Sequence, residues 1–588
     1  GAFGIQTDIS INGGTFDQIT ILVNGIAINN PQTGHNAADF PLNLADIERI
    51  EVLEGAASRV LGTQAFSGAI NIVTRQVGPT LYARAAGGSY GTAQGEVRGL
   101  FRHQFTNGNL FTSSLSAGYQ RSDGAVRNGD FKGGKAFWQG SLDAAQYKVD
   151  AQAGYTNTDF GANTFYSIAS TDQWESTTRY LASVKAETKG KIHIAPQISW
   201  LRNYDHFQFF RNTPTYENFN RGDVLTASLN LWTAWSLGRT AIGGEVRHEN
   251  IYSGNLGRDI NVDQRFRIPG QSLDKKDNKG IWRTHDGHLA EYTKSVDRTN
   301  VSLFAEHNVL LHDWTLSLGV LAQRNNAFGK DFRFYPGVDV AYRPAADWKV
   351  YASWNKSLRL PTFTELYYKS PSQEGNIGLK PEENSAFRLG TTFRPTAGVT
   401  LDVAAQYNHG TDVLDWVMYD AKDKFHAHNF QLDNYGISAS LALDGAMIFG
   451  ENQPLRRLRL DYAYLTQTRK DKEVYFKSNY AGEYLRHKFV ATLDHRLISR
   501  LNASWVFRLQ ERNGNYVVVD RTNPAKLKAT DQLMPYGLHG RLDLKLHWDA
   551  KNYSLFCDLQ NLTNHRFYDL ANVEQPGFVV MAGASYQF

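Results

Sequence analysis

The chain has 588 residues, of which 41% are hydrophobic and 13% aromatic, and its formal net charge is +4 on 62 basic and 58 acidic residues. So balanced a charge argues against a nucleic-acid-binding protein, and the single cysteine, Cys557, excludes an intrachain disulfide or a thiolate metal site. No apolar run reaches the roughly 18 to 20 residues that a membrane-spanning helix needs.

Residues 1–79 differ in texture from the rest and predict a small α+β domain. The chain opens on GAFGIQTDIS without a signal peptide, so we expect a mature protein whose beginning has been removed. The pattern predicts four short strands and one brief helical stretch, at Asp8–Ile11, Ile19–Val23, Ile50–Leu53 and Ala69–Val73, and at Leu44–Glu48.

Residues 80–588 repeat strand, turn, strand and loop. Apolar side chains alternate with polar ones, as in the stretch from Trp314 to Val320. A soluble β-sandwich gives the same local pattern, but no second core-forming texture occurs over this length. Tyr, Phe and Trp are also abundant enough for the aromatic girdles of a membrane barrel. We therefore expect an all-β transmembrane barrel of about 22 antiparallel strands, closed by a plug domain at residues 1–79.

Five ordered motifs resemble those of TonB-dependent outer-membrane receptors. GGSYG is similar to the opening of the family's first barrel strand, and no helix pattern follows it as a phosphate loop would require. The last motif, together with the terminal Phe588, resembles the family's closing strands. The motifs are ITILVNGIAINN (19–30), the stretch Asp46–Arg75, GGSYG (87–91), SLRLPTFTELYY (357–368) with GLKPEEN (378–384), and LQNLTNHRFYD (559–569).

The resemblance implies a place in the Gram-negative outer membrane and coupling to TonB through a box N-terminal to residue 1. It implies short periplasmic turns, such as His312–Asp313 and Asp549–Asn552, and longer extracellular loops, such as Asn157–Thr177 and Asn255–Lys294. A wet interface between plug and barrel is expected to let the plug shear partly open.

PQTGHN (31–36) and DFGANTFYS (159–167) are similar to a branch common in Bacteroidetes, some of whose members take up vitamin B12. Active import of a scarce bulky nutrient, with a corrinoid favoured, is the predicted function. Haem or a ferric siderophore stays open as the substrate. A passive porin or an adhesion barrel is the alternative of another class, and a surface lipoprotein partner is left open.

The ligand is expected between the plug tips and aromatic barrel loops. Neutral amides and hydroxyls at these tips suit a weakly charged ligand better than a catecholate iron complex. The alternative is that these residues satisfy their own turns or pack the loops. The predicted ligand-binding residues are Phe3, Gln6, Asn29, Asn30, Gln32, Thr33, His35 and Asn36 in the plug, and Phe165, Tyr166, Trp174 and Phe209 in the barrel.

The sequence shows no catalytic triad or carboxylate pair with enzyme spacing, so we expect neither an enzyme nor a cofactor. Two histidine pairs, His285 with His288 and His426 with His428, lack a third metal ligand. A solvated charge run is favoured over a calcium site for the loop acids Asp259, Asp263, Asp274 and Asp277.

Relatives in this family often carry two plug arginines that face two barrel-wall glutamates. The matching positions here are Asn12 and Glu54 in the plug, and Arg388 and Ser438 in the barrel. We expect one pair inverted in sign, Glu54 with Arg388, and the other neutralised, Asn12 with Ser438. Such pairs contribute little energy but fix registry. The alternative is that the four residues are unrelated polar groups of the lumen.

Overall fold

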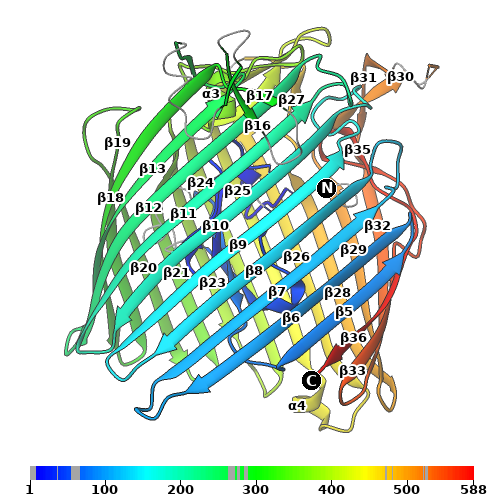
Figure 1. The fold of residues 1–588 in the computed structure, drawn as a ribbon. Helices are drawn as coiled ribbons and strands as arrows, with labels where there is room; N and C mark the ends of the chain where they lie inside the picture. Colours follow the sequence, from blue (N-terminus) through cyan, green and yellow to red (C-terminus); the bar gives the residue numbers. More distant parts are fainter. Residues whose placement is uncertain are drawn as a thin grey trace.

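Most of the chain forms one closed barrel that surrounds its first strands (Figure 1). The long loops gather at one end of the barrel, called the loop end, and most of the short turns lie at the other, called the turn end. The computed structural model describes residues 8–35, 38–54, 66–261, 272–274, 279–283, 289–470, 473–479, 481–520, 522–523 and 527–588.

The barrel closes because its last strand, β36, pairs antiparallel with its first, β5. Within the described residues 22 long antiparallel strands form the wall, which confirms the predicted fold class, and three two-residue segments extend it: β14 (Arg258–Asp259), β22 (Gln373–Glu374) and β27 (Lys477–Ser478). The long strands are β5 Leu81–Gly88, β6 Thr92–Gln104, β7 Leu110–Ser122, β8 Phe131–Asp143, β9 Tyr147–Gly161, β10 Trp174–Thr188, β11 Ile192–Gln208, β12 Glu217–Trp235, β13 Gly238–Ser253, β18 Lys294–Leu311, β19 Trp314–Asn325, β20 Arg333–Ala345, β21 Trp348–Arg359, β23 Glu382–Phe393, β24 Val399–Met418, β25 Phe425–Asp444, β26 Leu455–Arg469, β28 Leu485–Ile498, β29 Leu501–Arg512, β32 Leu538–Asp549, β33 Tyr553–Gln560 and β36 Val579–Gln587.

Smaller elements decorate the two ends. Among the helices of the described residues, none is both long and apolar enough to cross a bilayer. The helices outside the plug are α3 (Phe363–Tyr367), α4 (Gly445–Phe449) and the 3-10 turn η3 (Leu570–Asn572). The additional strands are β15 Ser272–Asp274, β16 Lys279–Arg283 and β17 Leu289–Glu291 in one small sheet, β30 Asn515–Asp520 with β31 Lys528–Pro535, and β34 Tyr568–Asp569 with β35 Val573–Glu574.

Two local predictions need correction. GGSYG does not open the first barrel strand; Gly87 and Gly88 end β5, and Ser89–Gly91 form the turn into β6. Tyr90 and Gly91 have φ of 59° and 60°, so the left-handed turn rather than a strand start explains this glycine. The strands β9 and β10 reach Gly161 and Trp174, further into the predicted loop 157–177 than expected.

The outer face of the barrel carries an apolar band with tryptophans at its turn end. Trp235, Trp314 and Trp348 flank short turns and are 51%, 50% and 44% exposed. Mid-strand Ile198 and Leu303 are also about half exposed. Large apolar side chains facing outward between aromatic girdles are typical of a lipid-facing surface.

The plug contains a four-stranded sheet in the order β2-β1-β4-β3, in which only the β1–β4 pair is parallel. Asn24 and Gly25, with φ of 52° and 82°, make the tight turn between β1 and β2. Its elements are η1 Phe16–Gln18, β1 Ile19–Val23, β2 Ile26–Ala27, η2 Leu44–Asp46, β3 Ile47–Leu53 and β4 Gly68–Thr74.

The predicted strand at Asp8–Ile11 is absent from the structure, and the helical stretch at 44–48 is only a three-residue 3-10 turn before β3. The first segment turns instead of pairing, because Gly14 N donates to Ile11 O at 2.9 Å and Asn12 and Gly13 adopt positive φ. The segment 8–16 consequently runs beside the barrel wall.

One side of the plug packs against the barrel through apolar side chains and is called the apolar flank. Ile19, Ile21 and Ile72 of the plug are fully buried. They share one cluster with four barrel residues from β8, β10, β11 and β12: Phe137, Leu181, Leu201 and Val224. The expectation of a wet interface is therefore wrong on this flank, because apolar residues of the barrel wall face the hydrophobic plug sheet.

Candidate functional site

The plug tip and the loops above it enclose the plug-tip cavity, which has a volume of about 90 Å³ and is partly open to solvent. Polar side chains come from the plug, from α3 and from the loop ends of β10, β11 and β12, and aromatic rings surround them. The lining includes Phe16, Asp17, Gln32, Thr33, His35, Tyr166, Gln173, Glu175, Asp205, Phe207, Phe209, Asn218, Asn220, Thr362, Glu365, Tyr368 and Trp416.

Helix α3 fastens one barrel loop to the plug tip. Thr362 caps the helix by accepting from Glu365 N at 3.2 Å. The backbone amides of Phe363 and Thr364 donate to Pro31 O at 2.9 Å and Gln32 O at 3.1 Å. Because these amides have no partner within their own helix, the plug carbonyls satisfy them.

A buried ionic network lies beneath α3. Arg359 donates to Glu365 Oε1 at 2.8 Å and to Glu382 Oε2 at 2.5 Å, and all three side chains are at least 94% buried. Gln18 of the plug donates to both oxygens of Glu382, at 3.2 and 3.1 Å. The network links the plug to β21 and β23 through fully engaged charges.

A second buried group supports the plug from the next strands. Glu249 accepts from Arg247 at 2.7 Å and from Arg298 at 2.5 Å. Arg247 also donates to Asn29 O at 3.1 Å, and Arg298 donates to Pro361 O at 2.5 Å. Arg247 and Arg298 thus each make their hydrogen bonds to Glu249 and to a backbone carbonyl.

The plug-tip cavity itself is rich in hydrogen-bond acceptors. Four carboxylates line it: Asp17, Glu175, Asp205 and Glu365. Three buried amide oxygens, those of Gln32, Gln173 and Asn218, have no hydrogen-bond partner among the described residues. Among the described lining residues none is Lys or Arg. The cavity therefore offers acceptors and negative charge.

Burial changes the acidity of two plug groups at this site. Burial, followed by the nearby Glu365 carboxylate, raises the pKa of Asp17 to about 7. Burial works to lower the pKa of His35, but the Asp8 carboxylate, 3.2 Å from its ring, raises that pKa overall. Asp17 and His35 belong to the plug, outside the membrane-spanning strands.

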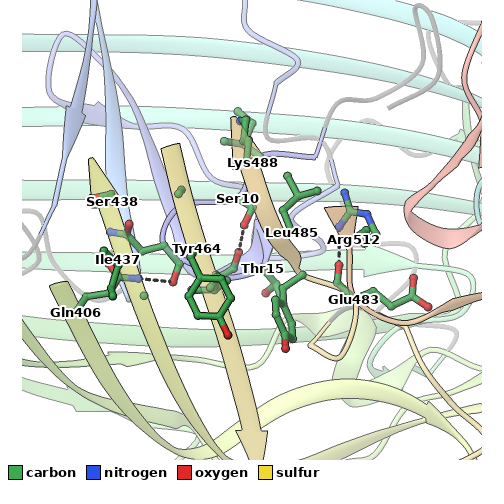
Figure 2. Close-up of a pocket in the computed structure, with 18 of the residues that line it drawn as sticks. Ser10, Thr15, Gln406, Ile437, Ser438, Tyr464, Glu483, Leu485, Lys488 and Arg512 are labelled. Atoms are coloured by element: carbon green, nitrogen blue, oxygen red, sulfur yellow. Dashed lines mark hydrogen bonds between the residues drawn. The ribbon is translucent and has the colours of Figure 1, made fainter. Parts of the chain in front are cut away.

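A second space, the wall cavity of about 290 Å³, lies between segment 8–16 and strands β24, β25, β26, β28 and β29. Figure 2 shows Gln406, Ser438, Tyr464 and Lys488 on the barrel wall beside Ser10 and Thr15 of the plug. Glu483 and Arg512 lie at its loop end, where Arg512 donates to Glu483 O.

A third, smaller space of about 40 Å³, called the lower cavity, is lined by Asn12 and Glu54. Glu54 forms an ion pair with Arg388 and accepts from the amide of Asn12 at 3.1 Å. Asn12 and Ser438 both line the wall cavity, but the carbonyl of Asn12 accepts from Gln406 at 3.3 Å and Asn434 at 2.8 Å. The wall thus holds Asn12 through amide side chains.

Family comparison identifies the protein class. Residues 81–562 match the family model described as TonB dependent receptor-like, β-barrel, and residues 1–69 match that of the TonB-dependent receptor plug domain. The chain belongs to the TonB-dependent receptor family. The fold of this receptor is characteristic of the Gram-negative outer membrane.

Two curated relatives of this receptor are named vitamin B12 transporter BtuB. The one from Photobacterium profundum is 24% identical over 401 residues, which are 66% of this chain and 58% of that protein. The one from Vibrio vulnificus is 21% identical over 418 residues, 71% of this chain and 62% of that protein. The chain therefore spans about three fifths of the relatives it matches.

Solved structures share the receptor's fold. The siderophore receptor PirA from Acinetobacter baumannii has a TM-score of 0.74 at 14% identity, covering 99% of this chain and 92% of its own. The FrpB iron transporter from Neisseria meningitidis has a TM-score of 0.73 at 14% identity, covering 100% and 94%. At such identity these likenesses show the fold alone.

The structure divides the predicted ligand-binding residues into three groups. Gln32, Thr33, His35, Tyr166 and Phe209 line the plug-tip cavity. Phe3, Gln6 and Asn36 lie outside the described residues. The remaining four, Asn29, Asn30, Phe165 and Trp174, do not line that cavity.

Those four make the turn and packing contacts of the alternative interpretation. The amide of Asn29 binds Ile21 N and Ile19 O, both at 2.8 Å. Asn30 accepts from Gln32 N at 3.0 Å. Phe165 packs in a loop cluster, and Trp174 stands edge-on to His206 at 5.2 Å between ring centroids.

Sequence reasoning missed the four cavity carboxylates. Glu365 lies inside the SLRLPTFTELYY motif, so the motif could have pointed to this carboxylate. Asp17 directly precedes Gln18 in η1 and had no such signal. Glu175 and Asp205 lie on strands whose inward face depends on barrel register, which no local pattern reveals.

The metal candidates gather no ligand set. Asp259 pairs with Lys294 at 2.6 Å, while Asp263, Asp277, His285 and His288 lie outside the described residues, as does the side chain of Asp274. His426 and His428 face single carboxylates, Asp423 at 3.1 Å and Glu473 at 3.6 Å. Across the described part of the chain no group of three His, Cys, Asp or Glu residues could hold a metal.

Proposed function

We propose that this receptor imports a bulky, weakly charged nutrient across the Gram-negative outer membrane, powered by TonB, and that a corrinoid is the preferred substrate. The observation that carries the substrate choice is the plug-tip cavity, which has four carboxylates, unpartnered acceptor oxygens and no lining Lys or Arg. The curated relatives named vitamin B12 transporter BtuB support the same choice.

The charge of the cavity discriminates between substrate classes. A ferric catecholate complex is an anion whose surface offers acceptors, so it meets the carboxylates of Glu175 and Asp205 and finds no Lys or Arg in the lining. A corrinoid carries peripheral primary amides, whose N–H groups match the unpartnered oxygens of Gln32, Gln173 and Asn218. Haem, with two propionates, is intermediate and remains the main competitor.

Coupling to TonB is inferred from the family, since the outer membrane has no ATP to release a tightly bound solute. A passive porin is disfavoured, because the apolar flank packs the plug against the inside of the barrel. An open porin would conduct ions, so purified wild-type receptor in a planar bilayer is expected to show no steady conductance.

Isothermal titration of the purified receptor tests the substrate choice. Cyanocobalamin is expected to bind with a dissociation constant at least 100-fold below those of haemin and ferric enterobactin. Tight binding of haemin without heat from cyanocobalamin would overturn the corrinoid while leaving the receptor class intact.

A charge variant tests the cavity as the binding place. Gln373→Lys adds a cation to its lining, so ferric enterobactin is expected to bind at least fivefold more tightly than to wild type. Gln453→Lys, at an exposed position outside the cavity, is the matched control and should change nothing. Equal effects of the two variants would place the binding site elsewhere.

A further inference from the structure

Three cavities follow one another along one side of the plug, called the cavity flank. The plug-tip cavity and the wall cavity share Phe16 in their lining. The wall cavity and the lower cavity share Asn12 and Gln406. A fourth space of about 270 Å³, bounded by β7 to β10 on the other side, shares no lining residue with them and is called the β7–β10 cavity. Of these four spaces, the three on the cavity flank form a series that starts at the plug tip.

The first barrier in this series is an aromatic pair of the plug. Phe16 is 4% exposed and stacks on His35 with 4.2 Å between ring centroids. His35 is held in turn by Asp8, at the start of segment 8–16. A shift of segment 8–16 therefore moves both Phe16 and the carboxylate that holds its stacking partner.

The second barrier is polar. The carbonyls of Asn12 and Gly13 accept hydrogen bonds from three amide side chains of the wall, those of Gln406, Asn434 and Gln467. Beside them stands the Glu54–Arg388 ion pair, in which the two side chains are 34% and 22% exposed. Hydrogen bonds and ion pairs in a partly hydrated space exchange with water at small net free energy.

The opposite flank resists the same movement. The plug sheet there shares a dry cluster with Phe137, Leu181, Leu201 and Val224 of the barrel. Separating such a surface exposes apolar area to water at about 25 cal/mol per Å². A pull on the plug is therefore expected to part segment 8–16 from the wall before the apolar flank opens.

We propose that the import path runs along the cavity flank, and that the wall cavity is a second, transient binding chamber between the Phe16–His35 barrier and the Asn12–Glu54–Arg388 contacts. This inference rests on the proposed import function. The wall cavity presents Lys488 and Arg512 together with Glu483, Tyr484 and Ser438, so it differs from the acceptor-rich plug tip. It suits a solute that carries acceptors as well as donors, such as primary amides.

Thiol labelling of intact cells tests the path without any substrate. In a Cys557→Ser background, Ser438→Cys reports on the wall cavity and Ser183→Cys on the β7–β10 cavity. The probe is a maleimide dye too large for general porins, added from outside. Phe16→Ala is expected to accelerate labelling of Ser438→Cys at least tenfold, because it joins the first two cavities, and to leave Ser183→Cys unchanged.

Leu42→Ala is the matched control for the loss of a buried plug side chain. Leu42 is 3% exposed and belongs to the apolar cluster, so its loss loosens the plug without joining the cavities. Heat-modifiable migration on gels verifies that each variant barrel folds. Unchanged labelling of Ser438→Cys in Phe16→Ala, or equal acceleration of both reporters, would overturn the path. Absence of any solute binding in the titration would instead overturn the proposed import.

Discussion

The two flanks of the plug differ in what joins them to the barrel. On the apolar flank, isoleucines of the plug sheet share one buried hydrophobic cluster with Leu181 and its neighbours. On the cavity flank, segment 8–16 is separated from the wall by the wall cavity and held by amides donating to its carbonyls. The plug is therefore held more firmly on one side than on the other, so one side can open while the other stays attached.

The largest effect is expected from a substitution that removes a buried side chain from the apolar flank. Leu181→Ala removes a barrel side chain that is 2% exposed, so the free energy of local opening of β1 should fall by about 2–5 kcal/mol. Native-state hydrogen exchange measures it. Leu465→Ala, a change of the same size on the cavity flank, should lower it by less than half as much, because space already exists beside it. Equal losses would contradict the comparison.

A substitution that fills one cavity tests the comparison between the flanks through its effect on transport. Ser438→Trp occupies the wall cavity and is expected to reduce uptake of radiolabelled cyanocobalamin at least tenfold, with its dissociation constant unchanged. Ser183→Trp fills the β7–β10 cavity and should leave uptake near wild type. A reversal of these two results would move the path to the other flank.

Reversing the ion pair is expected to have a moderate effect. Glu54→Arg places two cations together and should raise protease cleavage of segment 8–16 several-fold, because the pair is partly exposed and worth about 1 kcal/mol or less. Adding Arg388→Glu should restore resistance. If the double variant is cleaved and transports like the single one, the pair does not lock the plug.

The smallest effect is a pH dependence of the plug tip. The folded pKa of Asp17, about 7, lies above its ordinary value of 3.8, so its stabilising contribution is complete below 3.8 and is lost as pH rises through 7. Glu365, Arg359 and His35 are the titratable groups that face it. Its contribution thus favours the protonated, folded plug at mildly acidic pH.

Hydrogen exchange at residues 14–20, corrected for intrinsic rates, should show several-fold more protection at pH 5.5 than at pH 8. Asp17→Asn should flatten much of that difference. His35, whose folded pKa is also raised, contributes in the same direction and should leave a remainder. A variant with the full wild-type pH dependence would remove Asp17 from this account.

The sequence predicts the barrel well because alternation is local. Along β36, Ala582, Ala584 and Tyr586 are exposed while Val579 and Met581 are buried, as a closing strand requires. The strand expected at Asp8–Ile11 did not form because the chain turns there, with Gly14 N donating to Ile11 O and with Asn12 and Gly13 at positive φ. β-propensity alone does not take such competing contacts into account.

Only part of the candidate site could be predicted from the sequence, because the barrel fold and not local sequence brings its other residues together. Motif position places Gln32, Thr33 and His35 at the plug tip, where they line the cavity. The acids Glu175 and Asp205 come from neighbouring strands, and only closure of the barrel brings them opposite the plug. The dry apolar flank was also hidden, since Leu181 and Leu201 resemble any other strand leucines in sequence.

Helix α3 lies outside the plug but restrains its position. Two of its amides hold the carbonyls of Pro31 and Gln32, so the plug cannot descend unless α3 follows or releases them. Any contact that fixes α3 in place therefore also restrains the plug tip. Control of the plug through α3 does not require this helix to enter the pore.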